Sequence, residues 1–490
     1  MKPQKETDKS RMLKALSVRN NCPVAKKCGG CSYAGRSYFE QSIAKEKRVQ
    51  RLISPFCEVL PIHHCEDPLY YRNKVHSAFK KLKNGRIICG PYESGSHRIV
   101  ETDSCLIENK TATAIIRDCA MLAERYKVSI YDEVKGTGDL RRILVRTADA
   151  TGEIMVVLII GSEYFRKKKI FTDELLKLHP EITTLLININ KRHDSMILGS
   201  DEVKKVKGTG YITDEILGKK FRVSADSFMQ SNHEQAQILY SEAIRLADFN
   251  GTETCIDAYC GTGSTTLSFA GFVNNITGIE IKEAAYLDAL KNAKNNKIRN
   301  ATFVLGDATL YMDKLAKTHR KVDCVILDPT RAGTTMKFIK ACGKLKPSKI
   351  VYISCCPETL ARDLKGFTAQ GYEAQIAKPV DMFPWTDKVE TVVILSKLSN
   401  APKIEVKIKM SELDLTEAEA KATYDEIQKY VKQQTGLHVT HLNIAQIKRK
   451  HGIIERVNYN LPKCENPRRP NCPPEKEKAI IDALVHFKMI

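Results

Sequence analysis

The spacing of apolar residues changes along the chain and divides it into regions. From about Phe228, short apolar runs alternate with amphipathic stretches, which is typical of the strands and helices of a doubly wound parallel sheet. Residues 350–354 show this pattern: β-branched residues predict a buried strand, and "ETLARDL" after it predicts a helix. Before about residue 225, runs such as 141–161 are separated by turn signals such as "KGTGDL". This earlier part is predicted to be mostly β or α+β.

A helical extension follows the α/β part. Residues 416–452 predict a helix, a turn at Gly436 and a second helix, with Thr440 as its N-cap. The second helix ends in the basic run 448–450, so the pattern fits a helix-turn-helix as well as a small accessory bundle. A further amphipathic helix is expected after the prolines at 473–474.

These patterns predict four regions. They are a cysteine-bearing N-terminal region (1–105), a β-rich central domain (106–226), an α/β domain (227–399) and a helical extension (400–490).

A glycine turn and three acidic strand ends mark a ligand site in the α/β domain. "DAYCGTG" places a turn with Gly261 and Gly263 between a strand and a helix, but it lacks the third glycine of the dinucleotide fingerprint. Glu280, Asp307 and Asp328 end the next three strands, where a lone carboxylate is usually only a helix cap. Three of them around this turn fit S-adenosylmethionine better than a nucleotide phosphate.

The stretch "YISCCPETL" brings two cysteines to the same edge of the sheet. A thiolate beside a methyl donor suggests covalent activation of a pyrimidine, because carbon 5 of uracil becomes nucleophilic after addition at carbon 6. A base must then remove the carbon-5 proton, and Glu390 begins the next strand. The alternative for Cys355 and Cys356 is a pair of small buried hydrophobes, but the proline after them favours an exposed turn.

Three cysteines near the N-terminus have the spacing of metal ligands. Cys22, Cys28 and Cys31 form C-x5-C-x2-C, with two glycines that allow a tight backbone turn. A fourth ligand could come from one of four downstream thiols: Cys57, Cys65, Cys89 or Cys105. Four thiolates suit an iron–sulfur cluster or a structural zinc ion, and the spacing leaves both open.

The charge of +20 points to a polyanionic partner such as nucleic acid. Generic solubility is the alternative. No apolar run approaches the ~20 residues of a membrane helix, and the N-terminus lacks an apolar signal core, so we expect a cytoplasmic protein with reduced thiols. Basic residues on the predicted central strands are candidates for an RNA surface: Arg72, Lys74, Arg141, Arg142 and Arg146.

Seven ordered motifs over about residues 20–398 resemble the RNA uridine-5 methyltransferases of the RumA/TrmA type. The motifs are "SFMQSN", "DAYCGTG", "GIE", "LGDA", "LDPTRAG", "VYISCCPETLARDL" and "DMFPWTDKVE". The resemblance implies a Rossmann-like S-adenosylmethionine-dependent methyltransferase domain, an N-terminal iron–sulfur and β-rich RNA-binding part, and Cys355 as nucleophile with Glu390 as proton acceptor. The cofactor-binding residues it implies are Gln230, Tyr259, Ser264, Glu280, Asp307 and Asp328. It implies a [4Fe-4S] cluster, with zinc a minor alternative, on Cys22, Cys28, Cys31 and Cys105.

The sequence departs from the family pattern at four positions near the active site. Thr330 replaces the second proline of D-P-P-R, and Cys356 replaces the asparagine of S-C-N-P. Trp385 and Lys388 replace a polar residue and a histidine before the base. Trp385, the only tryptophan, is expected either to stack on a flipped base or to fill core.

The resemblance implies methylation of carbon 5 of a uridine in RNA, most directly in 23S ribosomal RNA, by a monomer without an obligate protein partner. A transfer-RNA methyltransferase and a catalytically inactive iron–sulfur RNA-binding protein are the alternatives. About twenty residues precede Cys22, which leaves no room there for the β-barrel RNA-binding module that often precedes the cysteines in this family.

Overall fold

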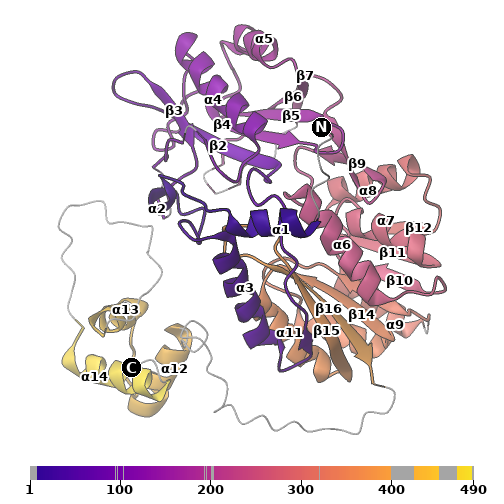
Figure 1. The fold of residues 1–490 in the computed structure, drawn as a ribbon. Helices are drawn as coiled ribbons and strands as arrows, with labels where there is room; N and C mark the ends of the chain where they lie inside the picture. The colour runs from indigo at the N-terminus through magenta and orange to yellow at the C-terminus, as the bar shows by residue number, and fades with distance from the viewer. Residues whose placement is uncertain are drawn as a thin grey trace. The chain divides into compact units, whose positions relative to one another are not determined.

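The computed structural model describes residues 8–93, 95–96, 98–102, 104–192, 194, 196–199, 203–318, 320–398, 424–451 and 472–487. The chain forms two compact units, Met1–Ala401 and Pro402–Ile490. Figure 1 shows their elements, and each unit is described by itself.

An eight-stranded sheet forms the α/β half of the first unit, which carries the predicted catalytic residues. Its central strands run parallel, whereas β16 is antiparallel to both of its neighbours. The strands in sheet order are β1 (Glu58–Val59), β15 (Tyr372–Val380), β16 (Glu390–Lys397), β14 (Lys349–Ser354), β13 (Cys324–Leu327), β10 (Thr254–Asp257), β11 (Asn275–Glu280) and β12 (Ala301–Leu305).

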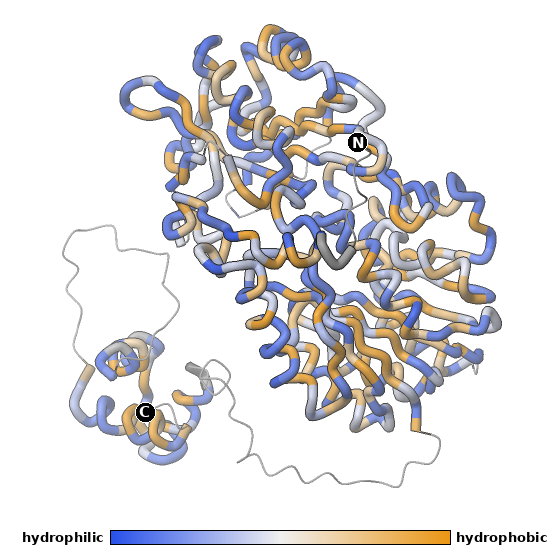
Figure 2. Tube along the Cα trace, in the orientation of Figure 1, coloured by the Kyte–Doolittle hydropathy of each residue, from blue (hydrophilic) through white to orange (hydrophobic). Residues whose placement is uncertain are grey.

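Successive residues of the buried strands pack into two different cores. In β14, Val351 and Ile353 join one hydrophobic cluster, while Ile350 and Tyr352 join another. This is the period-two alternation of a strand with both faces covered. Figure 2 shows the apolar strands inside and more polar helix surfaces outside. The covering helices are α3 (Tyr38–Ile53), α6 (His233–Ala247), α7 (Ser264–Phe269), α8 (Glu283–Asn295), α9 (Ala308–Lys317), α10 (Met336–Leu345) and α11 (Pro357–Thr368), with the 3-10 turn η1 (Ala270–Phe272) after α7.

A second sheet of six strands forms the central domain. In sheet order its strands are β3 (Ile87–Gly90), β2 (Lys74–Lys81), β4 (Leu140–Thr147), β5 (Ile154–Ile160), β6 (Ile182–Ile189) and β7 (Lys204–Lys207). The helices α4 (Lys110–Arg125) and α5 (Lys168–Leu178) share a hydrophobic cluster with these strands. The predicted β-rich character is therefore correct.

The predicted boundary between residues 105 and 106 is wrong. β2 and β3 lie before it, yet β2 pairs with β4, so one sheet spans the boundary. Earlier still, α3 packs on α11, and β1 pairs with β15 at the edge of the eight-stranded sheet. The N-terminal region is thus shared between the two sheets.

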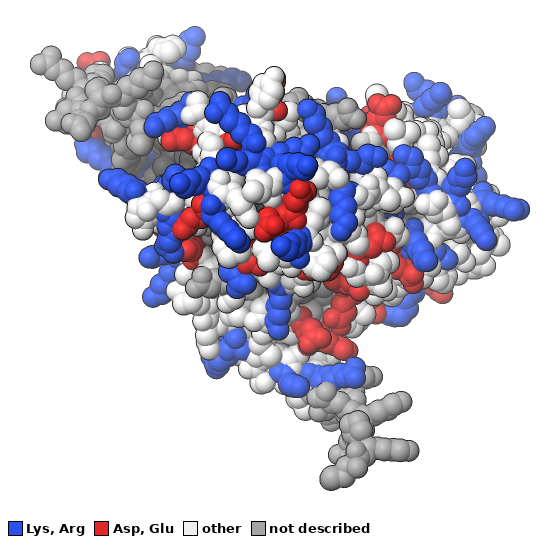
Figure 3. Space-filling model, turned by 90° about the horizontal axis from the view of Figure 1, so that it is seen from above, with Lys and Arg blue, Asp and Glu red and all other residues white. Residues whose placement is uncertain are grey.

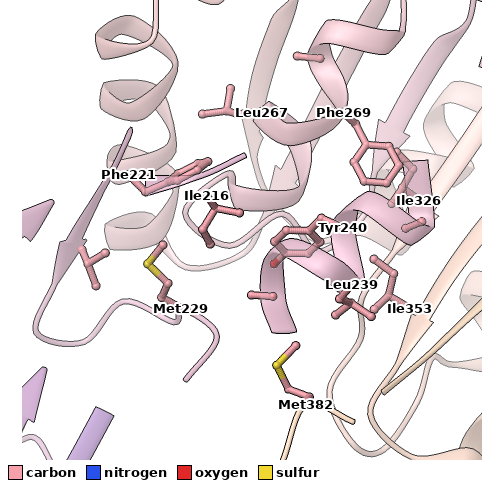
Figure 4. Packing of buried hydrophobic residues seen from close by; sticks show 14 of the residues in the cluster. Ile216, Phe221, Met229, Leu239, Tyr240, Leu267, Phe269, Ile326, Ile353 and Met382 are labelled. Carbon is pink, nitrogen blue, oxygen red and sulfur yellow. The ribbon is translucent and has the colours of Figure 1, made fainter. Parts of the chain in front are cut away.

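A hairpin connects the central and α/β halves through the core. β8 (Tyr211–Ile216) and β9 (Lys219–Ser224) are joined by Leu217 and Gly218, which both have positive φ, as a type I′ turn requires. Figure 4 shows Ile216 and Phe221 of this hairpin in the same cluster as Tyr240 of α6 and Ile353 of β14. This shared core fixes the hairpin against the eight-stranded sheet.

Two short helices precede α3. α1 spans Asp8–Ser17 and α2 spans Ala25–Cys28. α3 begins with a capping box, in which Ser37 and Glu40 each accept a hydrogen bond from the other's backbone N–H.

The second unit contains a three-helix cluster in its described residues. α12 (Tyr424–Thr435), α13 (His441–Lys450) and α14 (Pro474–His486) share a small apolar core, which fits both the bundle and the helix-turn-helix interpretation. The basic run at the end of α13 is partly exposed, since the side chain of Lys450 is 65% exposed. Lys448 is buried and Lys450 forms an ion pair with Glu477, while the side chain of Arg449 lies outside the described residues.

Within the described residues, no helix is long and apolar enough to cross a membrane.

Candidate active site

Two antiparallel strands bring the predicted nucleophile and base together. β14 pairs with β16 so that Ser354 lies opposite Thr391. One step further along the same register, Cys355 comes opposite Glu390, the first residue of β16. Asp328 directly follows the neighbouring strand β13, so its carboxylate arrives at the same edge. The structure therefore gathers three of the residues singled out in the sequence.

The surroundings of Cys355 keep its thiol protonated. Burial, followed by the charges of Glu390 and Asp328, raises the pKa of Cys355 to about 12. The guanidinium of Arg331 acts in the opposite direction and lowers this pKa. Arg331 belongs to the "LDPTRAG" motif, where the sequence pattern gives it no predicted role.

Glu390 is a buried carboxyl group with an unsatisfied oxygen. Its side chain is 3% exposed, and its Oε2 has no hydrogen-bond partner in the described part of the chain. Burial, and then the charge of Asp328, raises its pKa well above the ordinary value, while Arg331 opposes the shift. A buried carboxyl with a raised pKa and a free oxygen is typical of a group that exchanges a proton with a substrate.

These pKa values predict a pH dependence for nucleophilic attack. Because burial and the neighbouring charges raise the pKa of Cys355 to about 12, only a small fraction of this thiol is ionised at neutral pH. The thiolate fraction of a thiol with a pKa of about 12 then grows about tenfold per pH unit. The initial rate of adduct formation on RNA containing 5-fluorouridine should rise by about that factor per unit between about pH 6 and 9. A flat profile would contradict this account.

Cys356 has a different environment from Cys355. Its Sγ lies 3.4 Å from Oε2 of Glu358, to which it donates a hydrogen bond, and it is the N-cap residue of α11. Pro357 occupies the first position of that helix, where the missing N–H costs nothing. Cys356 therefore has a structural partner, whereas Cys355 lies one step beyond the last paired residues, opposite Glu390.

The glycine turn has the backbone shape that a close ligand requires. Gly261 and Gly263 adopt φ of 55° and 84°, and a Cβ on Gly261 would meet no atom within 4 Å. Glu280, at the end of β11, accepts hydrogen bonds from the backbone N–H of Gly261 at 3.0 Å and of Lys282 at 2.7 Å. The turn and this carboxylate are thus joined by hydrogen bonds at the carboxyl edge of the sheet.

Of the other predicted cofactor residues, Tyr259 and Ser264 adjoin the glycine turn along the chain, and Gln230 precedes α6. The Tyr259 hydroxyl lies 3.0 Å from Thr334 Oγ1, and Ser264 Oγ lies 3.3 Å from the hydroxyl of Tyr240. Gln230 is buried, and its backbone carbonyl oxygen accepts a hydrogen bond from the side-chain amide of Asn73.

Asp307 caps a helix. Its carboxylate accepts a hydrogen bond from Leu310 N at 2.9 Å, at the start of α9. This is the structural role that a lone acidic strand end usually has.

One residue of the glycine-turn motif was missed in the sequence. Asp257, the last residue of β10, is fully buried and accepts a hydrogen bond from Thr266 at 2.6 Å. Burial raises its pKa to about 6, and its charge contributes to a pKa of about 7 for Asp328. Asp257 is the first residue of the "DAYCGTG" motif, and this position is the feature of the sequence that could have identified it.

The four predicted cluster cysteines meet around one cavity. Cys22, Cys28, Cys31 and Cys105 all line a space of about 130 Å³, whereas the other candidates for the fourth ligand do not. Gly30 permits this arrangement, because a Cβ there would lie 3.3 Å from Cys28 Sγ. Four thiols around one cavity match the donor set of an iron–sulfur cluster. In the described residues, however, no three His, Cys, Asp or Glu side chains are placed to hold a metal ion.

Trp385 fills core. It is 0% exposed, its ring lies 5.7 Å from that of Tyr38, and its Nε1 donates a hydrogen bond to Pro68 O at 2.7 Å. A side chain enclosed on all sides offers no face to a flipped base, so of the two expectations for this residue the structure supports core packing. Cys31 and Cys105 pack against the same small cluster.

We expect Trp385→Ala to lower the free energy of unfolding by about 3–5 kcal/mol, because it would leave a large cavity and an unpaired Pro68 carbonyl. Urea denaturation would measure this loss. Tyr164→Ala is the matched control, since Tyr164 is 79% exposed and should leave stability nearly unchanged. Unchanged stability together with weaker RNA binding in Trp385→Ala would restore the stacking interpretation.

Three of the basic residues expected on an RNA surface are instead buried. Arg141, Arg142 and Arg146 on β4 are 2%, 7% and 3% exposed. Arg141 is paired with Glu133, and Arg146 donates to the carbonyl of Ser227. Exposed basic residues occur elsewhere on this domain, at 166–169 before and within α5. Figure 3 shows Lys and Arg outnumbering Asp and Glu on the face seen from above.

Comparisons with known proteins identify the family of this chain. The model of the tRNA (Uracil-5-)-methyltransferase family matches residues 152–398. An uncharacterized RNA methyltransferase of Halalkalibacterium halodurans is 38% identical over 383 residues, 77% of this chain and 83% of the relative. One of Listeria innocua is 37% identical over 389 residues, 79% and 85% of the two chains.

A solved structure shows the same fold. The Pyrococcus abyssi tRNA (uracil-54, C5)-methyltransferase, in complex with S-adenosyl-L-homocysteine, is 26% identical with a TM-score of 0.62, covering 75% of this chain and 85% of that one.

The sheet, the glycine turn and the solved structure define a Rossmann-like, S-adenosylmethionine-dependent methyltransferase. The chain belongs to the tRNA (uracil-5-)-methyltransferase family, which includes the RumA/TrmA-type enzymes, and it is an RNA (uracil-5-)-methyltransferase.

Proposed function

We propose that this enzyme methylates carbon 5 of a uridine in RNA through a covalent bond between Cys355 Sγ and carbon 6 of the uracil. The observation that carries the proposal is the register of β14 and β16, which sets Cys355 opposite the buried Glu390 beside the glycine turn. The same pairing supports a catalytic role over the inactive RNA-binding alternative. Absence of methyl transfer to any RNA would favour that alternative.

Two side chains act in the proposed reaction: Cys355 as the nucleophile and Glu390 as the base. The Cys355 thiolate adds to carbon 6, and the electron pair displaced from the double bond makes carbon 5 nucleophilic. Once carbon 5 carries the methyl group, Glu390 removes its proton, the double bond re-forms and the thiolate leaves. The thiolate is regenerated, so Cys355 is not consumed.

Bound S-adenosylmethionine supplies the methyl group. We propose that Glu280 and the turn at Gly261 receive its adenosine part, with Gln230, Tyr259 and Ser264 around it. Asp307 and Asp328 complete the proposed set, and Asp328 lies nearest to the reacting groups because its charge acts on both Cys355 and Glu390.

The proposed substrate is 23S ribosomal RNA. The support is the set of four cysteines around one cavity, which resembles the ribosomal-RNA branch of the family. Transfer RNA is the second candidate, because the matching family model and the Pyrococcus abyssi structure are both named for it.

Mapping 5-methyluridine in total RNA from cells with and without the gene tests the substrate class. Loss of a modification confined to 23S ribosomal RNA supports the proposal, and loss confined to transfer RNA supports the second candidate. The same cells allow fractionation and native mass measurement, which test the expected cytoplasmic location and monomeric state.

We also propose that Cys22, Cys28, Cys31 and Cys105 hold a [4Fe-4S] cluster. A single zinc ion needs all four sulfurs at about 2.3 Å from one point, whereas a cluster accepts thiols set further apart. The reaction transfers no electrons, so the cluster is assigned a structural role beside the core around Trp385.

Cys28→Ser should therefore lose its iron and its solubility together when the protein is prepared without oxygen. Iron and sulfide analysis with the visible absorption spectrum would measure the loss. Cys57→Ser is the matched control and should keep its iron, because Cys57 does not line the cavity. A colourless, zinc-loaded wild-type protein would overturn the cluster assignment.

A further inference from the structure

The loop between β15 and β16 ends at Glu390, the proposed base. Side chains of helix α3 form hydrogen bonds with this loop. Lys45 donates hydrogen bonds to Asp381 at 2.5 Å and to Phe383 O at 2.9 Å, and both partners of the ion pair are fully buried. Trp385, in the middle of the loop, has a left-handed backbone with φ of 69°. A bulky residue adopts that conformation only where its surroundings impose it.

Arg48, one turn further along α3, contacts two segments at once. Its Nε and Nη2 donate to the two carboxylate oxygens of Glu358 at 2.7 and 2.6 Å. Its Nη1 donates to the backbone carbonyl of Asp387 at 2.7 Å. A single guanidinium therefore joins the first turn of α11 to the end of the loop before β16.

The two segments that Arg48 joins carry the two reacting side chains. Glu358 lies three residues after Cys355, and Asp387 lies three residues before Glu390. Glu358 also accepts the hydrogen bond from Cys356 Sγ at 3.4 Å, which ties it to the turn that presents the nucleophile. The Arg48 bridge thus spans the nucleophile's turn on one side and the base's loop on the other.

The geometry of this bridge is specific to arginine. The guanidinium is planar and makes a two-pronged contact with the carboxylate while a third N–H reaches the carbonyl. The side chains of Arg48 and Glu358 are 25% and 29% exposed, so the ion pair adds little to the free energy of folding. Its main effect is to orient the two segments that Arg48 joins. A lysine has no planar fork and cannot reproduce the two-pronged contact.

We propose that Arg48 is a positioning residue that fixes the distance between Cys355 and Glu390 for the reaction. It acts through Glu358 and Asp387 and touches neither reacting group. The inference rests on the proposed function, in which these two side chains add to and deprotonate the same uracil. A displacement of about 1 Å at such a site can cost about 100-fold in rate.

The test compares Arg48→Ala, Arg48→Lys and the control Arg51→Ala in the full-length enzyme. Arg51 is exposed on the same helix. Turnover number, RNA dissociation constant and the steady-state fraction of RNA–protein adduct are measured for each. We expect Arg48→Ala to lower the turnover number about 10- to 100-fold with the RNA dissociation constant within about twofold. Arg48→Lys should recover only part of the activity, and Arg51→Ala should match the wild type.

A second variant, Glu358→Gln, weakens the same bridge from the other side and should show the same pattern more mildly. If Arg48→Ala fails to fold, Glu358→Gln carries the test alone. An unchanged turnover number in the folded variants overturns the proposal. Weaker RNA binding with an unchanged turnover number also overturns it and makes Arg48 an RNA contact.

The control reactions separate this inference from the proposed function. If the wild type methylates uridine at carbon 5 and Arg48→Ala does so equally well, only the positioning role fails. If the wild type forms no adduct and methylates no RNA, the proposed function itself fails.

Discussion

Cys355→Ala should abolish methyl transfer, with turnover reduced by about 10⁴-fold or more. Without addition at carbon 6, carbon 5 of uracil is not nucleophilic enough to accept a methyl group, so no other residue can compensate. The incorporation of labelled methyl groups into RNA would measure the loss. The variant should fold normally, because Cys355 is only partly buried and lies at a turn.

Cys356→Ala is the matched control, one residue along the same turn. It removes the hydrogen bond to Glu358 but leaves the thiol of Cys355, opposite Glu390, so it should keep most of the activity. The reverse pattern, with an active Cys355→Ala and an inactive Cys356→Ala, would place the nucleophile one residue later than the strand register indicates.

Glu390→Gln should slow turnover by about 10²- to 10⁴-fold and accumulate a covalent RNA–protein complex with ordinary substrate. An amide keeps the size of the side chain but cannot accept the carbon-5 proton, so the thiolate cannot leave. Denaturing gel electrophoresis of the reaction with labelled RNA would show the complex directly.

Glu358→Gln supplies the carboxylate control for this variant. It removes a nearby charge without removing the base, so its adduct should not approach that of Glu390→Gln. A fully active Glu390→Gln enzyme would exclude Glu390 as the base and point to another carboxyl at the same edge, of which Asp328 lies within electrostatic reach.

The sequence predicted the catalytic edge well because the relevant signals are local. Each strand of the α/β half ends where its apolar run ends, so Glu280, Asp328 and Cys355 were placed correctly at strand ends. Parallel strands share a carboxyl edge, and that rule alone brings these side chains together. Glu390 was predicted to lie near Cys355 because the strand that it begins was expected to start at the same edge.

Long-range pairing was not predictable in the same way. The boundary at residue 105 failed because β2 pairs with β4 across more than sixty residues that contain a helix. The local sequence of a strand does not predict which other strand it pairs with. The same limit explains Arg141 and Arg146, whose charges suggest exposure until the carbonyls of Asn190 and Ser227, distant in the sequence, are seen to accept their hydrogen bonds.

The contacts of α3 depend on tertiary structure alone. Lys45 and Arg48 read as ordinary polar positions on an amphipathic helix, because their partners lie more than 300 residues away. Trp385 had two plausible roles for the same reason, and only its enclosure by Tyr38 and Pro68 decides between them.

The most direct test of the account is to identify the residue that RNA containing 5-fluorouridine traps. Fluorine at carbon 5 cannot leave as a proton, so the enzyme should stop as a stable adduct in the presence of S-adenosylmethionine. Fragmentation mass spectrometry of the peptide that contains both cysteines would locate the attached nucleotide. The account predicts a methylated 5-fluorouridine on Cys355. A nucleotide on Cys356, or no adduct with an enzyme that still methylates ordinary RNA, would contradict it.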